Sequence, residues 1–156
     1  MSDRPGEPPS PASRWVIVDA SSLVRAALTP GSAARELVDA ALARGLLAAS
    51  APILDEVEEV LARPKFGRRL HESDRLCLVR RLRVGARLVV PGEAVRACRD
   101  PADGKYLEAA VAAASTAGAF EAVVIASDDR DPLALHPWRG VHVLKPEAAL
   151  LLLSAG

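Results

Sequence analysis

The stretch Trp15-Val16-Ile17-Val18-Asp19 decides the fold, because four consecutive apolar residues end abruptly at an acidic one. A short apolar run without alternation is typical of a strand that is buried on both faces, as in a parallel sheet. A second run of this kind, Val123-Val124-Ile125-Ala126, is followed directly by Ser127-Asp128-Asp129. Each of these two expected strands therefore ends at a carboxylate.

Helical patterns alternate with short apolar runs along the rest of the chain. Gly45 and Gly118 each follow such a pattern, where glycine readily adopts the left-handed conformation that ends a helix. Pro64 ends another pattern, and Pro146 opens the last one. This alternation predicts an α/β fold with a parallel sheet of about five strands, covered by helices on both faces. The expected strands are 15–18, 46–50, 88–90, 122–126 and 141–144, and the expected helices are 33–44, 52–63, 73–84, 103–116 and 146–153.

Length and composition indicate one domain. The chain has 156 residues, half of them apolar, with twenty Lys and Arg against twenty Asp and Glu. A domain of this length buries about 68–70% of its unfolded surface and needs no disulfide, so we expect Cys77 and Cys98 to be reduced. Residues 1–14 are rich in proline and predict a disordered tail before a domain over 15–156. Without a signal peptide or a run of about 18 apolar residues, we expect a cytoplasmic protein with no membrane partner.

Four carboxylates fall where an open parallel sheet places its functional crevice, at the carboxyl ends of the strands. Asp19 and Asp129 follow strands, and Glu56 and Asp103 lie near helix beginnings that adjoin the same edge. One interpretation makes Asp103 and Asp129 helix N-caps and places Glu56 on a solvated acidic face. The other gathers all four carboxylates, whose mutual repulsion bound Mg²⁺ or Mn²⁺ would remove.

The residue types favour hard cations over other cofactors. Carboxylates suit Mg²⁺ and Mn²⁺, whereas Zn²⁺ would ask for His or Cys, and His71, His136 and His142 show no paired spacing. Neither a P-loop nor a dinucleotide-binding glycine motif is present. Hydrolysis of a phosphodiester needs an activated water and stabilised oxygen charges, which one or two hard cations supply.

Four segments of the chain carry a resemblance to a known family. They are Asp19-Ala20-Ser21-Ser22-Leu23-Val24, Ser50 with Glu56 and Leu61-Ala62-Arg63-Pro64-Lys65-Phe66, Arg99-Asp100-Pro101-Ala102-Asp103-Gly104-Lys105-Tyr106-Leu107, and Ser127-Asp128-Asp129-Arg130-Asp131. In this order and at these spacings they resemble the PIN-domain family, and most closely its branch of toxin components of toxin–antitoxin systems. The resemblance spans about residues 15–153.

The resemblance implies a Mg²⁺- or Mn²⁺-dependent single-strand ribonuclease on a three-layer α/β/α sandwich. It also implies a homodimer and a cognate antitoxin protein that blocks the site. The alternative is a catalytically weak or inactive PIN domain that binds RNA or a protein. The implied catalytic and metal-binding residues are Asp19, Glu56, Asp103 and Asp129, with Ser21, Asp100, Ser127, Asp128 and Asp131 in support.

The chain departs from the family pattern at several of these positions. Ser21 stands where Asn is more common, Asp128 where Gly is usual, and Gly104 where a polar residue often follows the aspartate. The doubled Asp128-Asp129 leaves the fourth metal ligand open, although Asp129 fits the family spacing better.

A strongly basic segment lies in the middle of the chain. Nine of the twenty basic residues fall between Arg63 and Arg87, against only Glu72 and Asp74, so this segment carries 9 − 2 = +7. It is either a solvated helix face or a track for an RNA backbone beside the acidic pocket. With only five aromatic residues, recognition of single-stranded or structured RNA would rest on shape more than on stacking. The expected RNA-binding residues are Arg68, Arg69, Arg80, Arg81 and Arg83.

Two other α/β classes also place an acidic residue after their first strand. A phosphatase of the haloacid-dehalogenase type would have a second Asp two residues later, where this chain has Ser21. A response-regulator receiver would need a phospho-accepting Asp after the third strand, and Val90-Pro91-Gly92 supplies none. The sequence therefore favours the nuclease over both.

Overall fold

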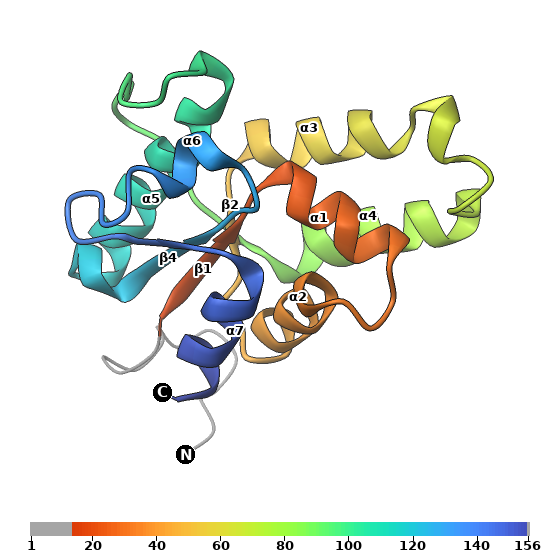
Figure 1. The fold of residues 1–156 in the computed structure, drawn as a ribbon, viewed down its shortest axis with the longest axis horizontal. Helices are drawn as coiled ribbons and strands as arrows, with labels where there is room; N and C mark the ends of the chain where they lie inside the picture. Colours follow the sequence, from red (N-terminus) through yellow and green to blue (C-terminus); the bar gives the residue numbers. More distant parts are fainter. Residues whose placement is uncertain (1–13, 156) are drawn as a thin grey trace.

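The computed structural model describes residues 14–155, and the centre of this part of the chain is a layer of five parallel strands (Figure 1). Three of them form a sheet in the order β1-β4-β5, and β2 pairs with β3 in a second sheet. A parallel bridge between Val16 and Leu47 joins the two sheets. The strands are β1 (Trp15–Val18), β2 (Ala48–Ala49), β3 (Arg87–Leu88), β4 (Val123–Ala126) and β5 (His142–Leu144). The expected α/β fold is confirmed, with its sheet divided into three strands and two.

Part of the backbone before β2 is used by a helix end. Gly45 has a φ of +66°, and the amides of Gly45 and Leu46 donate to the carbonyls of Leu42 and Ala41. This pair of bonds is the Schellman motif, and it satisfies carbonyls at the end of the preceding helix. The Leu46 amide is therefore not available to a neighbouring strand, although the Leu46 carbonyl accepts the Val16 amide at 2.8 Å. At the other end Ser50 is the N-cap of α3, so the strand expected over 46–50 is reduced to Ala48 and Ala49.

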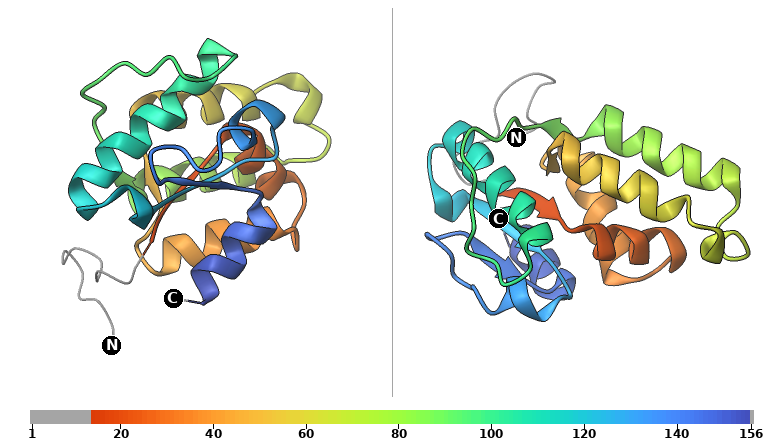
Figure 2. Two further views of the ribbon diagram at one scale, coloured as in Figure 1. Left: turned by 60° about the vertical axis from the view of Figure 1, so that its left-hand side comes forward. Right: turned by 90° about the horizontal axis from the view of Figure 1, so that it is seen from above.

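Helices cover both faces of the strand layer (Figure 2). Val16 and Val18 of β1 face a core that α1, α2, α3, α4 and α7 complete, whereas Trp15 and Ile17 face a second core built mainly on α5. This alternation follows from the period of two along a strand. Two separate cores, one on each face, give the expected three-layer α/β/α sandwich.

The expected helices are confirmed, and two helices were not predicted. The unpredicted ones are α1 and α6, and short 3₁₀ turns lie at Pro64–Phe66, Pro101–Asp103 and Phe120–Ala122. None of the described helices is long and apolar enough to cross a bilayer. The tail expected over residues 1–14 lies outside the described residues, apart from Arg14. The helices are α1 (Ala20–Leu28), α2 (Ala33–Ala43), α3 (Ala51–Leu61), α4 (Glu72–Gly85), α5 (Gly104–Ala117), α6 (Arg130–Leu133) and α7 (Pro146–Ser154).

The order of the strands fixes where a site can form. Across both sheets the order is β3-β2-β1-β4-β5, so the chain adds strands on one side of β1 and then returns to add β4 on its other side. In open parallel sheets, the crevice used for ligands lies where the strand order reverses, beyond the carboxyl ends of the two strands. Here those two strands are β1 and β4, which end at Asp19 and at Ser127-Asp128-Asp129.

Gly104 is required by a close approach of backbone. A Cβ at this position would lie 2.8 Å from the carbonyl oxygen of Val95. Glu108 holds the segment that contains Val95 against α5, because its carboxylate accepts the Val95 amide at 3.1 Å. The departure from a polar residue at position 104 therefore has a structural cause.

We expect Gly104→Ala to destabilise the protein. Helix propensity alone predicts a gain of up to about 1 kcal/mol for this change. The contact with Val95 predicts a loss of about 1–3 kcal/mol, because the neighbouring backbone must move. Urea unfolding measures the difference, and Glu108→Ala, which frees the segment, should reduce the loss. A gain in stability on Gly104→Ala would contradict this account.

Candidate active site

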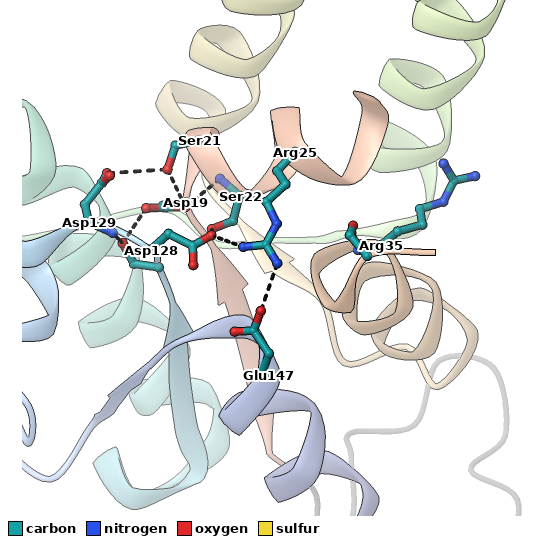
Figure 3. Close-up of polar contacts among 10 residues, drawn as sticks. Asp19, Ser21, Ser22, Arg25, Arg35, Asp128, Asp129 and Glu147 are labelled. Carbon is teal, nitrogen blue, oxygen red and sulfur yellow. Dashed lines mark hydrogen bonds and ion pairs between the residues drawn. The ribbon is translucent and has the colours of Figure 1, made fainter. Parts of the chain in front are cut away.

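Asp19 is the most buried carboxylate of the site, with 1% of its surface exposed. It is the N-cap of α1, and its Oδ1 accepts the backbone amide of Ser22 at 2.9 Å. Its Oδ2 accepts the hydroxyl of Ser127 at 2.5 Å, and the hydroxyl of Ser21 lies 3.2 Å from Oδ1 (Figure 3). The buried side chain is therefore held by the residue that follows β4 and by the first turn of α1.

The pKa of Asp19 is raised above its ordinary value. Burial, which disfavours the charged form, is the main cause, and the charge of Asp129 adds to it. Hydrogen bonds from Ser127 and Ser22 act in the opposite direction without cancelling the effect of burial. Asp19 therefore lies in an environment that favours either a proton or a bound cation.

Asp129 lies beside the same serine hydroxyl as Asp19. The hydroxyl of Ser21 lies 3.4 Å from Asp129 Oδ2 as well as near Asp19, and the Asp129 amide donates to the hydroxyl of Ser127 at 3.0 Å. Asp129 occupies the N-cap position of α6, yet its side chain makes no capping bond. Its carboxylate is thus directed toward α1, not committed to its own helix.

Asp103 belongs to the same electrostatic group. Burial is the main cause that raises the pKa of Asp103, and the charges of Asp100, Asp129 and Asp19 raise it further. The charge of Lys105 acts in the opposite direction. Asp103 is the residue before α5, and like Asp129 it makes no side-chain capping bond. The interpretation of Asp103 and Asp129 as helix N-caps is therefore wrong as an account of their carboxylates.

The outer carboxylates Asp100 and Asp131 lie on the same side. Asp100 accepts the amide of Ala102 at 3.0 Å, which starts the 3₁₀ turn before α5. Burial raises the pKa of the Cys98 thiol, and the charges of Asp103, Asp131 and Asp100 add to this rise. Cys98 is thus close to three carboxylates of the group.

Glu56 is brought to this edge but is already partnered. Its Oε2 accepts the Tyr106 hydroxyl at 2.9 Å and lies 2.7 Å from the Lys105 ammonium. The Tyr106 oxygen in turn accepts the amide of Ala20, which is the first residue of α1. Glu56 is therefore not part of a freely solvated acidic face, and its charge is compensated by Lys105. Sequence reasoning assigned no role to Lys105 or Tyr106, although both directly follow Asp103-Gly104.

Asp128 points away from Asp129 into a second cluster. Its Oδ2 lies 2.7 Å from Arg25 Nη1 and 3.5 Å from the hydroxyl of Ser22, and Arg25 Nη2 lies 2.8 Å from Glu147 Oε1 (Figure 3). The two adjacent aspartates thus serve different neighbours. Glu147 lies in the segment Leu144-Lys145-Pro146-Glu147, which is also similar to the family pattern, but Arg25 belongs to no motif, and only its contact with a residue 122 positions away reveals it.

The donor set fits a hard divalent cation. Among the described residues, Asp19, Asp103 and Asp129 make no ion pair, and the hydroxyls of Ser21 and Ser127 lie beside two of them, Asp19 and Asp129. The buried hydroxyl of Ser50, the N-cap residue of α3 at the same edge, finds no hydrogen-bond partner in the part of the chain that the structure describes. Within residues 14–155, no three His, Cys, Asp or Glu side chains lie close enough together to hold an ion. The donors are therefore suitable in kind, and a cation would have to draw them together.

The basic segment is divided between paired and unpaired arginines. Arg81 lies 3.1 Å from Asp39, and Arg83 contacts both Asp55 and Glu58. By contrast, the described part of the chain offers no ion pair to three of the predicted RNA-binding residues, which are Arg68, Arg69 and Arg80. α4 runs beside α3, and both project beyond the strand layer (Figure 2).

Comparison with known proteins yields one finding. A family model described as PIN domain matches residues 15–130, which is most of the chain. No curated protein and no solved structure matches. The matched range contains Asp19, Glu56, Asp103 and Asp129 and ends before Glu147.

We expect Asp19→Asn to raise the melting temperature of the metal-free protein at neutral pH. Asn keeps the N-cap of α1, since Asn and Asp cap equally well, and removes one buried charge. Asp19→Ala removes the charge and the cap, so it should be less stable than Asp19→Asn by about 1 kcal/mol, or roughly 2–4 °C. Thermal unfolding in EDTA measures both.

The pH dependence supplies the control. Because folding raises the pKa of Asp19, the cost of its charge is full above the folded pKa and disappears below the unfolded pKa. The advantage of Asp19→Asn should therefore shrink as the pH falls from 7 toward about 4. An advantage that is independent of pH, or a loss of stability at pH 7, would contradict the account.

Proposed function

The chain belongs to the PIN-domain family of metal-dependent nucleases, and on that premise we propose that it is a ribonuclease that hydrolyses single-stranded RNA with Mg²⁺ or Mn²⁺. One observation carries the proposal. At the point where the strand order reverses, Asp19 and Asp129 meet at one serine hydroxyl, and neither carboxylate has a cationic partner among the described residues.

Asp19, Asp103 and Asp129 would hold the cation, which supplies an activated water and stabilises the charge that develops on the phosphate. The Ser21 hydroxyl, between Asp19 and Asp129, and the Ser127 hydroxyl on Asp19 orient these carboxylates. Glu56 completes the proposed set from the side of α3, where Tyr106 and Lys105 fix its position. Asp100 and Asp131 add negative charge at the rim, which favours a divalent cation.

The proposed RNA track uses the arginines that are not engaged with carboxylates. Arg68, Arg69 and Arg80 are exposed and free to meet phosphates. Arg69 also lines a cavity of about 340 Å³ between α1, α2 and α4, beside Arg35 and Arg81, which both contact Asp39. α1 begins at the acidic pocket and ends at this cavity, so its nine residues span roughly 14 Å between the two. An RNA strand that runs along α1 would therefore reach both the acidic site and the cavity.

The toxin role is part of the same proposal. We expect a cognate antitoxin protein to block the acidic pocket, and we expect the nuclease to act as a homodimer. Both expectations rest on the resemblance of the four sequence segments to the toxin branch. Co-expression with a partner encoded beside the chain, followed by measurement of RNA cleavage, tests the first, and light scattering tests the second.

We expect the purified protein to cleave a labelled single-stranded RNA in Mn²⁺ or Mg²⁺ and to stop in EDTA. Asp19→Asn should abolish cleavage because it removes a ligand while it preserves the cap of α1. Glu36→Gln is the matched control, since Glu36 is an exposed carboxylate of α2 that makes no ion pair with the described residues. Equal cutting by the wild type and Asp19→Asn would reject the site. Binding of RNA without cleavage by the wild type would favour the inactive module.

The salt dependence of RNA binding separates the two groups of arginines. Each lost phosphate contact should lower the slope of log Kobs against log salt by about 0.7 for a single strand. Arg68→Gln with Arg69→Gln should lower it by about 1.4. Arg81→Gln with Arg83→Gln should lower it less, because these guanidinium groups already contact Asp39, Asp55 and Glu58. Both pairs of substitutions are made in the Asp19→Asn variant, which should not cleave the RNA, and filter binding at several salt concentrations measures the slopes. Equal effects of the two pairs would refute the division into paired and unpaired arginines.

A further inference from the structure

Two adjacent serines of α1 face two adjacent aspartates of the segment after β4. Ser21 contacts Asp129, and Ser22 contacts Asp128 (Figure 3). Asp129 has an extended backbone, with a φ of −82° and a ψ of 141°. Neighbouring side chains of an extended segment point to opposite sides. One carboxylate of the pair is therefore presented to Asp19, and the other is turned toward the next turn of α1.

Arg25 receives the carboxylate that is turned away. It lies three residues after Ser22 on the same helix, and its two terminal nitrogens contact different acceptors, Asp128 at 2.7 Å and Glu147 at 2.8 Å. Glu147 belongs to the first turn of α7. The guanidinium group thus connects three elements that are distant in sequence, which are α1, the segment after β4, and α7.

The energetics argue against a purely stabilising role for this cluster. The side chains of Arg25, Asp128 and Glu147 are 36%, 32% and 53% exposed. Ion pairs with this exposure contribute about 0–1 kcal/mol, so the cluster adds little to the folding free energy. A rigid planar guanidinium group is, however, well suited to fix the direction of two carboxylates.

We propose that Arg25 is a positioning residue that keeps the carboxylate of Asp128 out of the metal pocket, so that Asp129 alone faces Asp19. This inference rests on the proposed metal site. Without Arg25, the described residues offer Asp128 only the weak contact with Ser22 at 3.5 Å, and Asp128 is adjacent in sequence to Asp129 of the proposed metal site. A bound cation would then attract Asp128, which would add a ligand and change the affinity of the site.

The test is calorimetric titration of the full chain with Mn²⁺, without RNA. Arg25→Met should tighten Mn²⁺ binding at least fivefold, because it releases an additional carboxylate. Loss of the positive charge alone would tighten binding in every background, so the decisive comparison is made with Asp128→Asn. In that background, Arg25→Met should change the affinity less than about twofold, and Asp128→Asn alone should leave the wild-type affinity nearly unchanged.

Two controls separate this role from general electrostatics. In a Glu147→Gln background, Arg25→Met should still tighten binding at least fivefold, because Asp128 remains. Arg83→Met is a matched control, since Arg83 also contacts two carboxylates and is 39% exposed. It should change Mn²⁺ affinity less than twofold. Equal tightening by Arg25→Met with and without Asp128→Asn would overturn the inference while leaving the proposed metal site intact.

Two further measurements cover the remaining outcomes. Melting in EDTA shows whether each variant folds. If Arg25→Met fails to fold, the comparison uses Asp129→Asn, which should weaken Mn²⁺ binding at least tenfold, against Asp128→Asn, which should not. The reverse order would overturn the inference. Absence of Mn²⁺ binding by the folded wild type would overturn both this inference and the proposed function.

Discussion

The burial of one carboxylate, Asp19, is the constraint on which the rest of the structure depends. A charge that is 1% exposed is tolerated only when its oxygens are hydrogen-bonded. Ser22 supplies a backbone amide and Ser127 a hydroxyl, so the first turn of α1 and the end of β4 must both lie beside β1. The parallel pairing of β1 with β4 meets this requirement, and it also brings Asp129 close to Asp19.

Compensation of charge then divides the surrounding carboxylates into two groups. Glu56 is balanced by Lys105, and Asp128 is balanced by Arg25. In the described residues, Asp19, Asp103 and Asp129 have no ion pair, and the repulsion among them contributes to the raised pKa values of Asp19 and Asp103. A divalent cation is the simplest group that would relieve this repulsion. Lys105 and Arg25 thus compensate two of the carboxylates, and Asp19, Asp103 and Asp129 are left as the negatively charged site.

The sequence predicted those features that depend on local patterns. Buried strands such as Trp15–Val18 and helix ends such as Gly118 follow from apolar runs and glycine conformations, and they are confirmed. Helix α1 was not predicted, because Ser21 and Ser22 are weak helix formers directly after the N-cap residue Asp19. The spacing of the apolar residues of α1 was nevertheless a usable signal. Contacts between distant segments leave no local pattern. The sequence therefore indicated neither the contacts of Arg25 nor the ion pair between Lys105 and Glu56.

The central claim is that Asp19, Asp103 and Asp129 form a hard-cation site where the strand order reverses. Crystals soaked in Mn²⁺ test it most directly through the anomalous scattering of manganese. The account predicts a peak bound by oxygens of Asp19 and Asp129 at about 2.1 Å, with Asp103 on the same ion directly or through water. Absence of a peak in this pocket at millimolar Mn²⁺, or a peak held by Asp128 and Glu147 instead, would contradict it.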